Sequence, residues 1–525
     1  MKANFVRKIV AVALVLAVVG TMSGCSSSKA SAASDKGVNY EVTSGPYADK
    51  DVDLSTHENV VMYVLGDRPA DMDEVLEKAN KEYFEPNLNT DLSIEFLNWS
   101  DYQTKYPLLL SGGEQVDLIY TASWCFYNEE IAAGAFKELD EDFLKKNMPY
   151  TFEEEPSQAW DEISVGGKIY AVPKGQASFT AYDVALVRKD LIDKYNLTEP
   201  TSWDNFKKYL TELAEHTSEN GVTAMNTNAN REQLLSMYLQ SEKIQGVTEG
   251  YDWEYVADNS EAAPKQDDIF YLYTSDEYKK YCEEMAELAE KKVWSSDAIN
   301  DTTDPQAYFE NGTSGAFVWN NSIFAAGKNF ENAGLGEFAA YDVTPDTKRA
   351  RGAYSVDAIA ITSKAVNPER AALTLDYMKS DVDLNRLLLG GIEGKHWELT
   401  EDGARKTLDG AANYGWNSWA WAINRQDEPV EDGLDERQIK LMEACEAQEF
   451  VPEQTGFTFN PEKVQSQYQA VSAVVDEYRQ SFALGIYGDA TDSTFDTFKA
   501  QLEAAGIDAV TEEFLSQYNA YMSNR

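Results

Sequence analysis

Short apolar runs alternate with helical patterns in the first part of the sequence. Residues 60–65, 92–97 and 116–120 are rich in large apolar side chains, which is typical of strands buried on both faces of a sheet. Between the first two runs, apolar residues recur at helical spacing at Met72, Val75, Leu76 and Ala79. Strand, helix, strand, helix and strand predict an α/β fold with a parallel sheet. Such sheets bind ligands at the carboxyl ends of their strands, here beside Trp99 and Trp124.

The rest of the sequence continues this mixture and then becomes helical. Residues 316–319 and 358–361 are expected to be strands, and residues 201–204 and 460–461 have the pattern of helix caps. The chain has 525 residues, 43% of them hydrophobic, which is enough for more than one compact lobe. We find no internal repeat, and no apolar segment after residue 25 is long enough to span a membrane.

The N-terminus resembles a bacterial export signal. Three basic residues precede an apolar run over 9–19, which is too short to span a bilayer. The following Met-Ser-Gly-Cys, which ends at Cys25, resembles a lipobox, although Leu is usual where Met stands. We therefore predict a signal peptide over 1–24, lipidation of Cys25 and a flexible linker over 25–56. The alternative is an ordinary signal that is cleaved elsewhere.

Composition and missing motifs argue against several classes of function. Lys and Arg total 45 against 90 Asp and Glu, and the formal net charge of −45 disfavours nucleic acids and anionic lipid headgroups as partners. The sequence has no Gly-rich phosphate-binding loop, zinc-protease helix or nucleophile-elbow pentapeptide. The widely spaced Cys125, Cys282 and Cys445 predict buried thiols and no disulfide framework. We expect no catalytic residue, no metal and no cofactor.

Tryptophans occur beside amides and acids at four places. Residues 416–421 contain three indoles, and Trp124, Trp319 and Trp397 have polar or acidic neighbours. Sugar rings have an apolar C–H face and a rim of hydroxyls, which proteins contact with flat aromatic rings and planar polar groups. A single tryptophan of this kind is as consistent with a core as with a ligand site. Four clusters together favour a shared carbohydrate-binding cleft.

Several short motifs in a fixed order resemble the family 1 extracellular solute-binding proteins, the lipid-anchored receptors of ABC importers. These motifs are the lipobox and the segments 169–173, 187–191, 202–206, 311–316 and 367–372. Residues 391–397 and 502–507 are similar to a Gram-positive subgroup that has a C-terminal domain of unknown function and is commonly linked to uptake of complex carbohydrates. The resemblance covers nearly all of the chain after the signal.

The resemblance implies a two-lobed α/β fold of the periplasmic-binding-protein-like type II class, with a hinge and a helical C-terminal part. Lobe 1 would comprise 57–172 with 306–353, and lobe 2 would comprise 173–305 with 354–525. Closure of the lobes would trap an oligosaccharide, and the closed form would deliver it to the permease of an ABC importer. The protein would be a monomer, anchored to the outer face of the cytoplasmic membrane, and not an enzyme.

The candidate ligand-binding residues follow from this arrangement. The expected aromatic platforms on lobe 1 are Trp99, Trp124 and Trp319. The expected platforms facing them from lobe 2 are Trp397, Trp416 and Trp419. The candidates for hydrogen bonds to the ligand are Asp67, Asp357, Glu393 and, beside the second crossing between the lobes, Tyr354.

Other interpretations of these features stay open. A receptor of the same fold could bind a peptide or an amino-sugar derivative, with Arg68, Arg188 or Arg425 holding a charged group. A surface glycoside hydrolase would also need aromatic and acidic residues, but it would consume the saccharide. An adhesive surface protein would show no saturable site for a small ligand.

Overall fold

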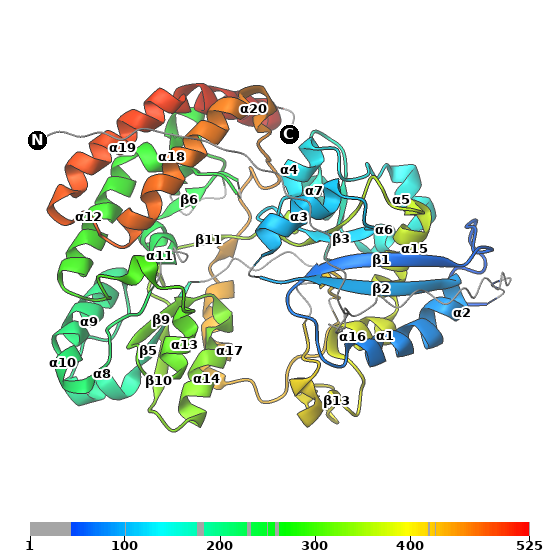
Figure 1. Cartoon of the computed structure of the whole chain (residues 1–525), viewed down its shortest axis with the longest axis horizontal. Helices are drawn as coiled ribbons and strands as arrows, with labels where there is room; N and C mark the ends of the chain where they lie inside the picture. Colours follow the sequence, from blue (N-terminus) through cyan, green and yellow to red (C-terminus); the bar gives the residue numbers. More distant parts are fainter. Residues whose placement is uncertain are drawn as a thin grey trace, which may run out of the picture. The chain divides into compact units, whose positions relative to one another are not determined.

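The computed structural model describes residue 42 and residues 44–99, 101–175, 183–227, 233–248, 250–257, 262–417, 421–425 and 427–523. The predicted signal peptide, the lipidation site Cys25 and the platform residue Trp419 lie outside these residues. None of the described helices is long and apolar enough to cross a membrane. The ribbon of the described residues forms two lobes (Figure 1). Their buried hydrophobic side chains belong to separate cores, one in the first lobe and two in the second.

The first lobe is built on a five-stranded sheet with the order β2-β1-β3-β12-β4. Its strands are β1 (Glu58–Leu65), β2 (Thr90–Leu97), β3 (Leu118–Thr121), β4 (Ala171–Pro173) and β12 (Ala358–Ile361). β1 runs parallel to β2 and β3, whereas β12 is antiparallel to β3 and β4. The predicted parallel arrangement of the first three strands is therefore confirmed.

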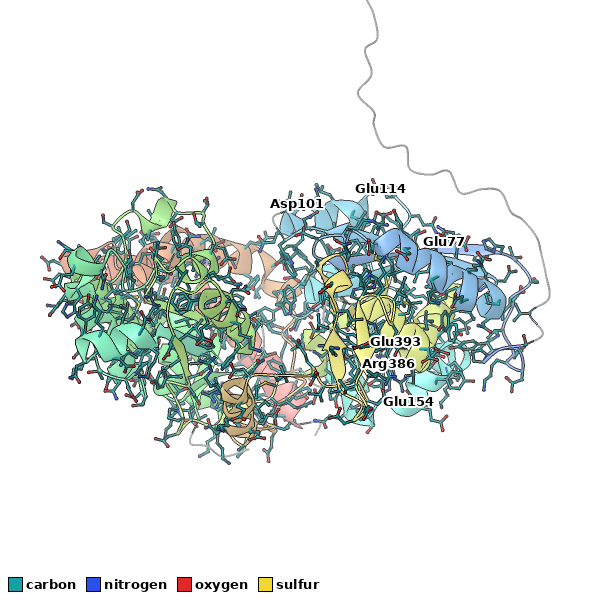
Figure 2. All side chains as sticks on the ribbon, turned by 90° about the horizontal axis from the view of Figure 1, so that it is seen from below. Glu77, Asp101, Glu114, Glu154, Arg386 and Glu393 are labelled. Carbon is teal, nitrogen blue, oxygen red and sulfur yellow. The ribbon has the colours of Figure 1, made fainter. Side chains whose placement is uncertain are left out.

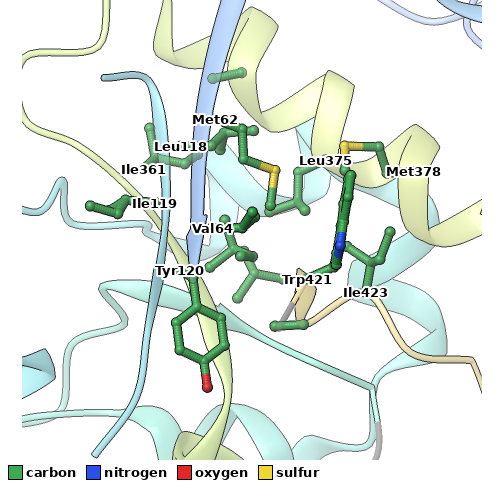
Figure 3. Close-up of a cluster of buried hydrophobic side chains, with 14 of the residues drawn as sticks. Met62, Val64, Leu118, Ile119, Tyr120, Ile361, Leu375, Met378, Trp421 and Ile423 are labelled. Carbon is green, nitrogen blue, oxygen red and sulfur yellow. The ribbon is translucent and has the colours of Figure 1, made fainter. Parts of the chain in front are cut away.

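Helices cover this sheet and complete the first core. They are α1 (Met72–Ala79), α2 (Glu85–Leu88), α3 (Tyr102–Ser111), α4 (Tyr127–Ala132), α5 (Glu141–Asn147), α6 (Pro149–Glu154), α7 (Ser157–Ile163), α15 (Pro368–Ser380) and α16 (Val382–Gly390). Asn367 caps α15 by accepting a hydrogen bond from the Arg370 amide. Met62 and Leu118 from the sheet and Leu375 from α15 belong to one buried cluster (Figure 3). Trp421, from the tryptophan-rich segment, is buried in the same cluster and is therefore a core residue.

The second lobe contains two small antiparallel sheets. The first has the order β10-β5-β9, from β5 (Val184–Arg188), β9 (Ala316–Trp319) and β10 (Phe338–Tyr341). The second has the order β6-β7-β8, from β6 (Ile244–Gly246), β7 (Trp253–Val256) and β8 (Phe270–Tyr271). The helices along this part of the chain are α8 (Lys189–Tyr195), α9 (Trp203–Glu215), α10 (Thr217–Asn220), α11 (Gln233–Ser241), α12 (Asp276–Glu290), α13 (Pro305–Glu310) and α14 (Phe324–Asn332).

The C-terminal helices complete the second lobe. They are α17 (Glu436–Glu446), α18 (Gln465–Ala483), α19 (Thr491–Ala505) and α20 (Ile507–Ser523). Phe482 from α18 and Phe498 from α19 pack against Tyr278 from α12, with ring centroids 6.2 and 6.5 Å from the tyrosine ring. α19 ends at Gly506, which adopts the left-handed conformation with φ of +98°.

The predicted assignment of residues 306–353 to lobe 1 and of residues 354–525 to lobe 2 is wrong for two strands. β9 lies in residues 306–353, which were expected in lobe 1, but it pairs with β5 of the second lobe. β12 lies in residues 354–525, which were expected in lobe 2, but it pairs with β3 of the first lobe. A crossing pair, β11 (Arg349–Ala350) beside β15 (Glu449–Phe450), links the two parts. A hairpin, β13 (Trp397–Leu399) and β14 (Arg405–Thr407), follows α16.

Candidate functional site

A cavity of about 270 Å³ is lined by residues of both lobes and of the crossing segments. The first lobe contributes Ser123 and Glu162, and the second contributes Thr248 and Glu254. Arg351 follows the crossing strand β11, and residues 454–458 lie in the segment between α17 and α18. We call this space the hinge cavity. Its position between segments of different lobes makes it sensitive to lobe movement.

Two exposed tryptophans follow strands β2 and β3 of the first lobe, and one of them, Trp124, is next in sequence to Ser123 of the hinge cavity. The side chains of Trp99 and Trp124 are 45% and 43% exposed and stack with ring centroids 6.5 Å apart and 27° between planes. The Trp124 indole N–H donates to the Val356 carbonyl at 3.0 Å. The amide of Ser123 donates to the Ser355 carbonyl at 2.9 Å, and both serines line the hinge cavity. The expected platforms Trp99 and Trp124 are thus brought together at the carboxyl ends of β2 and β3.

A buried ion pair forms one wall of the hinge cavity. Glu162, on α7, accepts a hydrogen bond from an Arg351 Nη atom at 2.5 Å, and these side chains are 0% and 11% exposed. The same carboxylate accepts hydrogen bonds from the Tyr354 backbone N–H at 3.0 Å and from the Gln158 side-chain amide at 2.7 Å. The Arg351 guanidinium lies 5.0 Å from the centre of the Tyr354 ring. The candidate Tyr354 therefore belongs to a network that joins the first lobe to the crossing.

Two further polar side chains line the cavity from the other side. Glu254 on β7 is buried, and its burial, together with the nearby Asp252 carboxylate, raises its pKa to about 8. Gln454 is also buried and donates its side-chain N–H to the Tyr255 hydroxyl at 3.0 Å. Neither residue was among the sequence candidates.

The predicted acidic ligand partners do not converge on the hinge cavity. Asp67 is exposed and accepts a hydrogen bond from the Asn98 side chain. Asp357 is buried and already accepts hydrogen bonds from the Tyr120 hydroxyl and the Lys174 ammonium, both at 2.5 Å. Glu393 is exposed on the first lobe (Figure 2). Among the described residues, no group of three or more His, Cys, Asp or Glu side chains could hold a metal ion.

The other predicted platforms occupy different places. Trp319 is half-buried on β9 and therefore belongs to the second lobe, not to the first. Trp397 is buried, with its indole N–H donating to the Gly391 carbonyl at 3.0 Å. Trp416 contacts Trp397 edge to face at 5.4 Å, has the Arg405 guanidinium 4.4 Å from its ring and packs against the first core. The expected placement of these two tryptophans on lobe 2 is wrong, because their segment stays with the first lobe.

Comparison with known proteins places the chain in a family. The model of the bacterial extracellular solute-binding protein family matches residues 66–383, more than half of the chain. The chain belongs to this family. The C-terminal part of this solute-binding protein, residues 453–523, matches a domain of unknown function (DUF3502). The predicted family and the predicted two-lobed α/β fold of type II are thereby confirmed.

A curated relative and several solved structures are similar to this solute-binding protein over most of its length. The relative is a carbohydrate ABC transporter substrate-binding protein of Streptococcus pneumoniae serotype 4 (strain ATCC BAA-334 / TIGR4), 23% identical over 89% of this chain and 91% of its own. The N-glycan transport solute binding protein NgtS of Streptococcus pneumoniae has a TM-score of 0.70 at 19% identity, over 89% of this chain and 99% of its own. An extracellular solute-binding protein of Bifidobacterium longum subsp. infantis has a TM-score of 0.62 at 16% identity, over the same shares.

Proposed function

We propose that this protein is an extracellular receptor that captures an oligosaccharide by lobe closure and delivers it to an ABC importer. The observation that carries the proposal is the half-exposed, stacked pair Trp99 and Trp124, of which Trp124 directly follows Ser123 in the wall of the hinge cavity. Flat indole faces suit the C–H faces of sugar rings, and the cavity adds polar groups for their hydroxyls. The curated relative is a carbohydrate transporter component, and NgtS has been crystallised with Man1GlcNAc and with Man5GlcNAc, which supports the same ligand class here.

The receptor would work by closure of its lobes and would leave the bound ligand chemically unchanged. Because both lobes line the hinge cavity, a ligand bound there touches both and favours the conformation in which they approach. The permease would then select that closed conformation. Net charge of −45 leaves this mechanism intact for an uncharged ligand, because no charge attraction is needed.

Trp124→Ala should weaken oligosaccharide binding about tenfold or more, because the ligand loses a flat contact surface worth about 1.4 kcal/mol. Isothermal titration with a panel that includes Man5GlcNAc and kestose measures the effect. The matched control is Leu108→Ala, which also removes an exposed apolar side chain, in this case from α3. It should leave the affinity unchanged. Equal affinities of the wild type and Trp124→Ala would contradict the platform. Shortened saccharide recovered after incubation would indicate a hydrolase instead.

We also propose that lipid on Cys25 holds the receptor at the outer face of the cytoplasmic membrane. Cys25→Ser should release the protein into the medium, since the thioether to the lipid cannot form. Fractionation of cells and mass spectrometry of the N-terminal peptide measure this. The variant Ser26→Ala should stay with the membrane, and retention of Cys25→Ser there would count against the anchor.

A further inference from the structure

Two buried side chains in the hinge cavity have hydrogen-bonding capacity that the protein leaves unused. Glu254 is 8% exposed and Gln454 is 2% exposed, and both line the cavity. Among the described residues, the Glu254 carboxyl has no hydrogen-bond or ion-pair partner, and the Gln454 side-chain oxygen has no donor. Burying such groups without partners is unfavourable. Their position therefore indicates a partner that enters the cavity from outside.

Charges near Glu254 do not favour its ionised form. Arg351 is the only cationic residue among the described residues that line the cavity, and Glu162 already pairs with it at 2.5 Å. Asp252, directly before the same strand, adds a negative charge. The residues paired with Glu254 on the neighbouring strands are Gly246 on β6 and Phe270 on β8, neither of which is charged. The remaining titratable residues that line the cavity are Tyr127 and Tyr251.

We propose that Glu254 recognises the ligand as a neutral carboxylic acid, donating its O–H to a ligand oxygen, while Gln454 accepts a hydrogen bond from a ligand hydroxyl. The pKa of about 8 for Glu254 supports a neutral form at physiological pH. This pair of groups suits a neutral polyhydroxylated ligand, because each hydroxyl can both donate and accept. The inference rests on the proposed function and deepens it.

The assignment also gives the C-terminal domain a part in recognition. Gln454 lies in the stretch that matches the domain of unknown function, at the start of its residues 453–523. This stretch lies close to both lobes: the Thr248 hydroxyl of the second lobe donates to the Phe457 carbonyl, and Gly456 lies so near α7 of the first lobe that a Cβ there would be 3.2 Å from the Glu162 Cα. The domain thus supplies a wall of the ligand site in addition to its packing on the second lobe.

Titration of the wild-type protein with Man5GlcNAc, or with kestose if that binds more tightly, between pH 6.5 and 9.5 tests the proposal. Because the ligand needs the protonated carboxyl, affinity should be constant below pH 7 and fall about tenfold per pH unit above the Glu254 pKa of about 8. Buffers of different ionisation enthalpy should reveal proton uptake on binding near pH 8.5. Affinity that stays constant to pH 9.5 without proton uptake would overturn the proposal and leave the proposed function standing. Failure of every saccharide to bind at every pH would overturn both.

Variants separate Glu254 from other carboxyls. Glu254→Gln retains an N–H donor and cannot ionise, so its affinity at pH 9.5 should equal that at pH 6.5. Glu130→Gln, which changes a buried carboxyl whose pKa is also raised but which does not line the cavity, should keep the wild-type pH profile. Gln454→Leu should lower affinity about fivefold at every pH. A pH profile that survives in Glu254→Gln would overturn the assignment, and if that variant does not fold, proton uptake by the wild type decides.

Discussion

Replacing Glu162 with alanine should destabilise the protein by about 3–5 kcal/mol, because it leaves the Arg351 guanidinium buried without its carboxylate. The Tyr354 amide and the Gln158 side chain lose their acceptor in the same step. These groups connect α7 of the first lobe to the crossing segment, so the variant should also shift the balance between lobe conformations. Urea denaturation measures the stability, and small-angle scattering with and without ligand measures the closure.

Two comparisons test whether the cost comes from an uncompensated buried charge. The double variant with Glu162→Leu and Arg351→Met should be more stable than Glu162→Ala alone, because it leaves no unpaired charge. Glu138→Ala breaks an exposed ion pair with Lys168 on the same lobe and should cost less than about 1 kcal/mol. If Glu162→Ala lowers the free energy of unfolding no more than Glu138→Ala does, the ion pair of Glu162 and Arg351 does not stabilise the connection between the first lobe and the crossing segment.

The hydrophobic pattern predicted strands better than it predicted their partners. Residues 316–319 and 358–361 were expected as strands and correspond to β9 and β12. Their apolar runs fit either lobe equally well, because a buried strand has the same pattern in any sheet. Only the long-range pairing of β9 with β5, and of β12 with β3, decides the lobe. The helix caps at Ser202 and Asn460 were predictable because a cap depends on neighbours in the sequence.

The candidate site was only partly predictable for a related reason. Trp99 and Trp124 follow recognisable strands, so their meeting at one edge of the sheet could be expected. Trp397 and Trp421 show no difference from them in local sequence, yet both are buried. Glu254 is one of 90 acidic residues, so the presence of an acidic side chain did not distinguish it from the others. The sequence signal that could have found it is a single acidic residue between two aromatic ones, Trp253 and Tyr255. In the structure all three are buried in the short strand β7.

Glu254→Gln should stabilise the ligand-free protein at pH 9. The folded pKa of Glu254, about 8, lies above the ordinary glutamate value of 4.5, so the folded state binds this proton more tightly than the unfolded state. The wild type therefore loses stability as the pH rises from about 4.5 to 8, and the loss reaches on the order of 5 kcal/mol above pH 8. A neutral glutamine avoids that cost at high pH.

The difference in unfolding free energy between Glu254→Gln and the wild type should be small at pH 5 and large at pH 9, by urea denaturation without ligand. Equal differences at both pH values would show that the carboxyl is not kept neutral by its surroundings. Glu153→Gln, which changes an exposed acid on α6, provides the baseline for charge removal. A group that lowers the stability of the empty protein persists when it contributes to binding, as strained or poorly solvated groups at functional sites commonly do. One proton controls both properties, but over different pH ranges: the stability of the empty protein should fall between about pH 4.5 and 8 and then level off, whereas the affinity should fall only above about pH 8.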